Sequence, residues 1–280
     1  MATSRAFERI FIIMLENEQE SAVRQDDFML SLESRGVRLS DYHGVTHPSQ
    51  PNYVASLAGI PIVPDDNTYD IDRSSLVDLL ESKNVTWKAY IEDLPQKSKA
   101  IATQGLYCRK HNPFVSFNNI RNDPARLAKV VNASLLLTDV SNNKLPQFCW
   151  YTPNIQNDGH SPPNVKPSDF AGSVTYLSKW LRGFLSPLLD NPNFNNGTLT
   201  VVTFDESIPY ADNHVYTTLL GSMVKPGTTE NERYTHYSLL RTVEENFDLG
   251  TLRTSDVTAS WFGFLWGIKP QAFDWSRHRQ

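Results

Sequence analysis

The stretch Val201-Val202-Thr203-Phe204-Asp205-Glu206-Ser207 is a hydrophobic, β-branched run that ends in two adjacent carboxylates. Its composition predicts a buried strand over 199–204, because β-branched and aromatic side chains are enriched in strands. In an open α/β sheet, ligands bind outside the carboxyl ends of the strands. Asp205 and Glu206 therefore either open a polar turn or form part of a binding site, and the stretch alone leaves both interpretations open.

A second strand is predicted over 9–15, and it leads directly into Glu16 and Asn17. If both strands lie in one open sheet, their carboxyl ends deliver polar side chains to the same region. Together with Asp205 and Glu206, these residues supply three carboxylates and an amide oxygen, which are ligands that hard divalent cations prefer. The two strand ends therefore predict the walls of one metal site.

Strand-like and helix-like segments alternate along the rest of the chain. Further strands are predicted over 37–42, 86–91, 147–152 and 217–223, and helices over 26–34, 52–59, 76–83, 124–132, 167–190 and 236–247. This alternation predicts an α/β fold with a mostly parallel sheet and helices on both faces. No repeat or long linker divides the chain, so we expect one domain over 1–280, with the polar segment 104–122 as an excursion over the sheet edge.

Composition limits the class of partner. The 280 residues are 40% hydrophobic and 20% charged, as in an ordinary globular protein, and the formal net charge is −5. This charge argues against nucleic acid as the main partner, but a small phosphorylated substrate needs only local positive charge. No apolar run is long enough for a membrane-spanning helix.

Three N-x-Ser/Thr sequons, at Asn84, Asn132 and Asn196, are candidate acceptors for N-glycans. No apolar signal-peptide core precedes the first strand, so a secretory leader was either removed from this sequence or never part of it. We expect a secreted protein, with a cytosolic location as the alternative. Whether Cys108 and Cys149 form a disulfide is left open by the sequence.

The segment 46–53, Thr-His-Pro-Ser-Gln-Pro-Asn-Tyr, places Ser49 at a predicted helix N-terminus. Pro51 suits the first turn of a helix, where a missing N–H costs nothing. Backbone N–H groups and the helix dipole would there stabilise an alkoxide or a bound phosphate. Ser49 is therefore either a nucleophile for phosphoryl transfer or an N-cap. The chain has no Gly-x-Ser-x-Gly elbow, so a metal could activate the hydroxyl instead.

Three histidine contexts could complete such a site. His160 follows the predicted strand 147–152 and comes two residues after Asp158, which makes it the strongest candidate. His111 lies in a basic segment before a proline turn, and His236 begins a predicted helix. The remaining histidines are interpreted as structural or surface residues: His43, His47, His214 and His278.

A series of short motifs in this chain resembles the phosphoesterase family, which contains microbial acid phosphatases and bacterial phospholipases C and belongs to the alkaline-phosphatase-like superfamily. The motifs are Glu16-Asn17, His47-Pro48-Ser49-Gln50-Pro51-Asn52-Tyr53, Lys110-His111-Asn112-Pro113-Phe114, Pro153-Asn154 through Asn157-Asp158-Gly159-His160, Thr203-Phe204-Asp205-Glu206 and His236-Tyr237-Ser238. They occur in the expected order over about residues 9 to 250. The resemblance implies a three-layer α/β/α sandwich with one metal-centred site at the carboxyl edge of its sheet.

Transferred to these positions, the resemblance also implies a role for each motif. The implied metal ligands are Glu16, Asn17, Ser49, Asp205 and Glu206, and Ser49 is also the implied nucleophile. The implied contacts to the phosphoryl oxygens or the leaving group come from Asn17, Asn52, Lys110, His111, His160 and His236. This chain departs from the family at Glu18-Gln19-Glu20, where members often carry Ser-Phe-Asp, which implies a different rim beside the metal.

The resemblance and the residues together predict a metal-dependent phosphoric monoester hydrolase of the acid phosphatase type. A phosphoserine would form on Ser49, and His160 or His111 would donate a proton to the leaving alkoxide. The oxygen-rich ligand set favours Ca²⁺, Mg²⁺ or Mn²⁺, whereas a histidine ligand would favour Zn²⁺ or iron. Two alternatives are a phosphodiesterase or phospholipase C with the same site, and a non-catalytic secreted binding protein on this fold.

Overall fold

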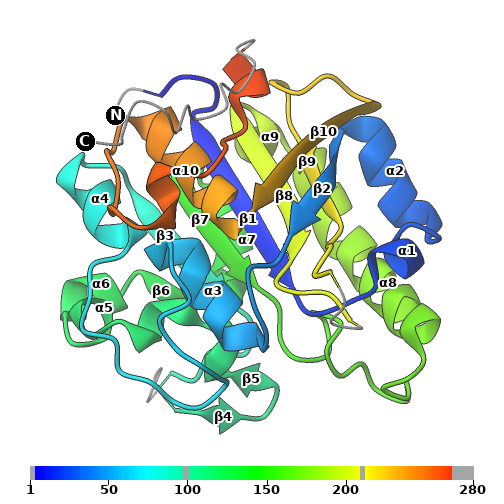
Figure 1. The fold of residues 1–280 in the computed structure, drawn as a ribbon, viewed down its shortest axis with the longest axis horizontal. Helices are drawn as coiled ribbons and strands as arrows, with labels where there is room; N and C mark the ends of the chain where they lie inside the picture. The colour runs from blue at the N-terminus through cyan, green and yellow to red at the C-terminus, as the bar shows by residue number, and fades with distance from the viewer. Residues whose placement is uncertain (1–3, 97–100, 209–211, 267–280) are drawn as a thin grey trace, which may run out of the picture.

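The computed structural model describes residues 4–96, 101–208 and 212–266. An eight-stranded sheet runs through them in the order β10-β2-β9-β8-β1-β7-β3-β6 (Figure 1). The strands are β1 Arg9–Leu15, β2 Val37–His43, β3 Trp87–Ile91, β6 Val130–Asn132, β7 Phe148–Thr152, β8 Thr198–Phe204, β9 Thr217–Leu220 and β10 Thr228–Thr235. β9 runs antiparallel to both of its neighbours, and the other pairs are parallel.

Helices cover both faces of this sheet (Figure 1). One layer contains α3 Ser49–Ala58, α4 Leu76–Ser82 and α10 His236–Phe247, which contact one another. The other contains α1 Glu20–Val23, α2 Asp27–Arg35, α7 Leu136–Ser141, α8 Phe170–Leu189 and α9 Pro192–Asn195. The predicted three-layer α/β/α architecture with a mostly parallel sheet is therefore confirmed.

The central strands are buried on both faces. Every residue of β8 is buried, and in β1 only Arg9 is not fully covered. Strands that are covered on both sides have nearly continuous apolar sequences instead of alternating ones. This explains why the two strands that lead into the predicted carboxylates can be recognised from the sequence alone.

The helix predicted over 124–132 is wrong beyond its first turn. Helix α6 spans Pro124–Leu127, and the chain then forms the edge strand β6. Val130 and Val131 pair in parallel with Ala89 and Tyr90 of β3. The tertiary pairing satisfies the β preference of these two valines and ends the helix early.

Other boundaries also differ from the prediction. The helix predicted from residue 167 begins at Phe170, because the Asp169 side chain caps it by accepting the Gly172 N–H. The strand predicted over 217–223 ends at Leu220, and β10 is an edge strand with no predicted counterpart. No helix in the described part of the chain is long and apolar enough to cross a membrane.

The segment 104–122 is more than a surface excursion. It contains β5 Tyr107–Cys108, the 3-10 helices Arg109–His111 and Pro113–Ser116, and α5 Asn118–Arg121; β5 pairs with β4 Thr103–Gln104 as a separate ribbon. The segment then brings His111 into the interior, where the side chain is 2% exposed. Cys108 and Cys149 are both free thiols.

Candidate active site

Several loops meet at the carboxyl edge of the sheet and bring the predicted site residues together. Glu16 follows β1, Ser49 begins α3 after β2, and Asp205 and Glu206 follow β8. The strand ends are joined by backbone hydrogen bonds, since Asp205 N donates to Leu15 O at 2.9 Å. On the other side, Glu16 N donates to the Asp158 carbonyl at 2.9 Å. The loops after β8 and β7 therefore flank Glu16.

Ser49 lies between two of these carboxylates. Its Oγ donates a hydrogen bond to Glu16 Oε2 at 2.9 Å and lies 3.2 Å from Glu206 Oε1. All three side chains are buried. The hydroxyl carries a single proton, so it can donate to only one of these two carboxyl groups at a time.

The N-terminus of α3 is partly occupied by a carboxylate from its own chain. Asp66 Oδ1 accepts the Gln50 N–H at 2.9 Å, and Asp66 Oδ2 accepts Lys110 Nζ at 2.9 Å. Asp66 therefore occupies one of the N–H groups at the helix N-terminus that were predicted to stabilise an alkoxide or a bound phosphate. The same bridge fixes Lys110 near the start of the helix.

Two histidines surround Glu16. His111 Nε2 lies 3.0 Å from Glu16 Oε1, and His160 Nδ1 lies 3.0 Å from Glu16 Oε2. The other nitrogen of His111, Nδ1, lies 3.0 Å from Asp158 Oδ2. Ligand atoms of Glu16, His111 and His160 all lie within 4.8 Å of one another, which is a spacing that a metal ion could bridge.

These contacts determine the charge states around Glu16. Burial alone would raise the pKa of Glu16, but the charges and hydrogen bonds of His111 and His160 hold it well below its ordinary value. Burial alone would lower the pKa of His111, but Glu16 and Asp158 raise it to about 9. Glu16 is therefore ionised and His111 is protonated at neutral pH.

The pKa values of Asp205 and Glu206 shift in the opposite direction from that of Glu16. Burial and the charges of Glu16 and Glu206 raise the pKa of Asp205 well above its ordinary value. Burial and the charge of Glu16 likewise raise the pKa of Glu206 to about 8. Neither carboxylate oxygen of Asp205 has a hydrogen-bond partner among the described residues. Since buried polar atoms are normally paired, this oxygen cluster fits a hard divalent cation.

Two residues that were predicted to contact the substrate, Asn52 and His236, form hydrogen bonds within the protein. Asn52 Oδ1 accepts the N–H groups of Val45 and Thr46, and its Nδ2 donates to the carbonyls of Thr46 and Pro48. His236 is fully buried, and its ring nitrogens contact the Asp205 carbonyl and the Tyr42 hydroxyl.

Burial lowers the pKa of His236 to about 4, so the ring is neutral at ordinary pH. In this structure both Asn52 and His236 use their polar atoms on the protein itself. Asn17 and Lys110, which were also predicted to contact the substrate, are both half-buried; Asn17 lines a cavity beside His160, and Lys110 pairs with Asp66.

Three residues of the site were missed by the sequence-based prediction. His47 was interpreted as structural, yet its Nδ1 contacts Glu206 Oε2. Asp158 was considered only as a neighbour of His160, whereas its carboxylate pairs with His111. Asp66 carried no sequence signal at all. The proximity of His47 to Ser49 in the chain was the one available clue to its position.

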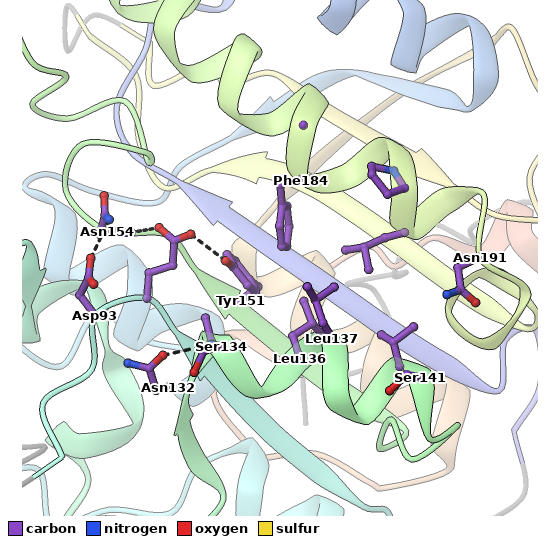
Figure 2. A pocket seen from close by; sticks show the side chains of 16 residues that line it. Asp93, Asn132, Ser134, Leu136, Leu137, Ser141, Tyr151, Asn154, Phe184 and Asn191 are labelled. Atoms are coloured by element: carbon purple, nitrogen blue, oxygen red, sulfur yellow. Dashed lines mark hydrogen bonds between the residues drawn. The ribbon is translucent and has the colours of Figure 1, made fainter.

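Hydrogen bonds hold Asn154, which precedes Asp158 and His160 in the chain (Figure 2). Asn154 Nδ2 donates to Asp93 Oδ2 at 2.7 Å, and Asn154 N donates to Glu92 Oε2 at 2.9 Å. Glu92 also accepts the Tyr151 hydroxyl at 2.9 Å. These residues border a pocket of about 520 Å³ between α7 and α8, and Ser49 does not line it.

Comparison with known proteins places this geometry in a family. Residues 23–250 match the model of the Phosphoesterase family. This chain belongs to the phosphoesterase family. The phosphoesterase chain is 37% identical over 269 residues to a protein named "Probable acid phosphatase" from Kluyveromyces lactis, covering 91% of this chain and 62% of that protein. It therefore spans less than two thirds of the length of this relative.

This phosphoesterase covers a larger share of another relative. The chain is 32% identical over 249 residues to "Phosphatidylinositol-3-phosphatase" from Mycobacterium tuberculosis, which covers 87% of this chain and 78% of that protein. Among solved structures, the phosphonate monoester hydrolase from Silicibacter pomeroyi matches with a TM-score of 0.64 at 12% identity, covering 95% of this chain and 78% of that chain.

A protein in the alkaline phosphatase superfamily from Vibrio parahaemolyticus matches with a TM-score of 0.61 at 12% identity, covering 91% of this chain and 71% of that chain. At such low identity, these structural matches show the shared fold.

Proposed function

We propose that this phosphoesterase is a metal-dependent phosphoric monoester hydrolase in which Ser49 is the nucleophile and a phosphoserine is the intermediate. The observation that carries the proposal is the Ser49 hydroxyl between the buried carboxylates of Glu16 and Glu206. The names of the relatives, several acid phosphatases and a phosphatidylinositol-3-phosphatase, support phosphate monoesters as the substrate class.

Glu16, Asp205, Glu206 and the Ser49 hydroxyl would hold one divalent cation, with Asn17 at the rim as a further oxygen donor. A bound divalent cation supplies positive charge that lowers the pKa of the serine hydroxyl and neutralises phosphoryl oxygens. The unpaired oxygens of Asp205 support this oxygen-based set and hence Mg²⁺, Ca²⁺ or Mn²⁺. If His111 and His160 bound the metal together with Glu16, Zn²⁺ or iron would be expected, and elemental analysis of the purified protein distinguishes the two sets.

In the first step, Ser49 Oγ attacks phosphorus and the bond from phosphorus to the leaving alcohol oxygen breaks. The hydroxyl proton moves to Glu16 Oε2 or Glu206 Oε1, which already lie within hydrogen-bond distance of Oγ. His160 uses Nδ1 on Glu16, so its Nε2 is the ring nitrogen that can give a proton to the leaving oxygen. Lys110 and His111 add positive charge beside the phosphoryl group.

In the second step, water attacks the phosphorus of the phosphoserine and the bond from phosphorus to Oγ breaks. His160 Nε2 takes one proton from the water, and Ser49 Oγ recovers its proton from the carboxylate. One ester and one water therefore give one alcohol and one phosphate, and the site returns to its starting state. His236 and Asn52 act as positioning residues, since they hold the Asp205 backbone and the turn before Ser49.

Acid-quenched turnover of p-nitrophenyl phosphate tests this proposal. Peptide mapping is expected to find phosphate on Ser49 in the active protein and none in the Ser49→Ala variant. Steady turnover without phosphoserine during rapid quench would overturn the covalent mechanism. An inert preparation would favour the non-catalytic binding protein, and faster hydrolysis of bis(p-nitrophenyl) phosphate than of the monoester would favour a phosphodiesterase.

We also infer that the protein passes through the secretory pathway. Two of the sequon asparagines, Asn84 and Asn196, are exposed and lie in turns. Detection of the protein in the culture medium of its source, compared with the cell lysate, tests this inference.

A further inference from the structure

A cavity of about 370 Å³ opens beside His160. It lies between the loop after β1, the loop after β7 and the start of α8. Its apolar lining consists of Pro162, Val165, Pro167, Phe170 and Ile208, and the charged Lys166 also lines it. Its polar lining includes Asn17 and Glu18, which directly follow Glu16. The cavity therefore adjoins the reacting centre on the side of the His160 ring.

Glu18 is unusual among the residues of this cavity. Its side chain is 2% exposed, and its Oε2 has no hydrogen-bond partner in the described part of the chain. Glu18 Oε1 lies 3.4 Å from the position that a Cβ on Gly159 would occupy, so the Glu18 side chain packs closely against Gly159. A buried polar atom without a partner destabilises a folded protein unless a ligand or water satisfies it.

The neighbouring carboxylate shows a different pattern. Glu20 Oε1 pairs with Arg38 Nη2 at 2.9 Å, both side chains are half-buried, and Glu20 does not line the cavity. Glu18 and Glu20 belong to the same segment in which this chain departs from the sequence that family members often carry. Of these two acids, only Glu18 faces the cavity beside His160.

We propose that this cavity binds the leaving alcohol, and that Glu18 selects phosphate esters whose alcohol carries further hydroxyl groups, that is, polyol phosphates. The proposal rests on the proposed function, in which the leaving oxygen lies at His160 Nε2 and the rest of the alcohol extends into the cavity. A hydroxyl group both donates and accepts hydrogen bonds, so it pairs with a carboxyl group in either protonation state.

The remaining walls fit the same class of alcohol. Phe170 and the prolines present apolar surfaces to the C–H groups of a polyol, while Asn17 offers a second polar partner. The volume lies near the lower end of the range for small-molecule sites, which suits a short polyol. A simple alkyl alcohol would leave Glu18 Oε2 buried and unpaired, and sites built to pair with a hydroxyl discriminate against ligands that lack it.

A matched pair of substrates tests the proposal. Glycerol 1-phosphate and n-propyl phosphate share a three-carbon chain and differ in two hydroxyl groups. We expect kcat/KM to favour glycerol 1-phosphate by about tenfold or more in the natural protein. Glu18→Leu should bring this ratio close to one, Glu18→Gln should keep most of it, and the control Glu20→Gln should leave it unchanged. A ratio near one in the natural protein, or an unchanged ratio in a folded Glu18→Leu variant, overturns the proposal.

Calorimetric binding separates this inference from the proposed function. The Ser49→Ala variant, which cannot form the phosphoserine, is titrated with each of the two esters. Tighter binding of glycerol 1-phosphate without turnover in the natural protein would support the cavity assignment and contradict the proposed function. Turnover of both esters without any preference in rate or binding would contradict the cavity assignment alone, and equal binding without turnover would contradict both.

Discussion

Ser49 Oγ lies 3.2 Å from Glu206 Oε1, although 157 residues separate the two in the chain. The contact joins the turn between β2 and α3 to the end of β8, and the two strands are separated in the sheet by β9. His47 contacts the other oxygen of the same carboxylate. Glu206 therefore contacts both His47 and Ser49, the two ends of the short segment that leads into α3.

Replacing Ser49 with alanine is expected to lower kcat by at least about 10³-fold, because a nucleophile acts as a unit with its activating groups. The fold should persist, since alanine is accepted within the first turn of a helix. Hydrolysis of p-nitrophenyl phosphate and the thermal midpoint are the two measurements. Ser56→Ala is the matched control, because the Ser56 hydroxyl lies in the same helix and donates only to the Asn52 carbonyl. Residual activity within tenfold of the natural protein would exclude Ser49 as nucleophile.

Asp205→Asn is expected to abolish metal binding and activity together. In the metal-free state at neutral pH the variant should be more stable than the natural protein. Burial and the charges of Glu16 and Glu206 raise the pKa of Asp205, so folding must protonate a group that is ionised in the unfolded chain, and asparagine avoids this cost. Added metal at about 100 times its dissociation constant should stabilise the natural protein by about 2.7 kcal/mol and the variant hardly at all. Thermal unfolding with and without a chelator gives both values. Equal metal-induced shifts in the two proteins would contradict the assignment of Asp205 as a ligand.

Asn52→Leu distinguishes a positioning residue from a substrate contact. The variant leaves the N–H groups of Val45 and Thr46 without their partner, which should cost about 2–4 kcal/mol of unfolding free energy. We expect kcat to fall because the turn before Ser49 loosens. Urea unfolding and steady-state kinetics provide the measurements. A raised KM with unchanged stability would instead show that Asn52 binds the substrate.

The buried pair of Glu244 and Asp256 should make stability depend on pH away from the active site. Burial and Asp256 raise the pKa of Glu244 to about 9 from its ordinary 4.5. Between these values the folded protein keeps a proton that the unfolded chain has released, so this group's contribution to stability falls as pH rises, by at most about 1.4 kcal/mol per pH unit.

The Glu244→Gln variant removes this titration. It should match the natural protein near pH 5 and become progressively more stable than it toward pH 8.5 in urea unfolding. A difference that stays constant over this range would show that Glu244 titrates normally.

Expression in a secreting yeast should give glycans on Asn84 and Asn196 but not on Asn132. The Asn132 side chain is half-buried, and its Oδ1 and Nδ2 are bonded to Ser134 N and Leu94 O, whereas the other two asparagines are exposed. Mass spectrometry of peptides before and after enzymatic deglycosylation reads the occupancy of each site. Full occupancy of Asn132 would show that the local bonds break before the chain folds.

The strand ends could be predicted because their signal is local. A buried parallel strand has a continuous apolar sequence, and the side chains that follow it must lie at the sheet edge, so Glu16, Asp205 and Glu206 could be placed together. Ser49 had the additional signal of a proline in the first helical turn.

The rest of the site depends on long-range packing. His111 reaches the interior through an irregular segment whose polar sequence predicts a surface position. Asp158 and Asp66 gain their roles from partners that are distant in the chain, namely His111 and Lys110. Helix propensity around 124–132 was overridden in the same way by pairing of Val130 with Ala89 of β3.

Strand β8 separates the glycosylation sequon at Asn196 from the active-site residue Asp205. Gly197 and β8 lie between Asn196 and Asp205, and a seven-residue strand spans about 23 Å, so the two residues lie at opposite ends of β8. An anchor attached through Asn196 would therefore fix this protein to a solid support with its reactive edge facing the solution.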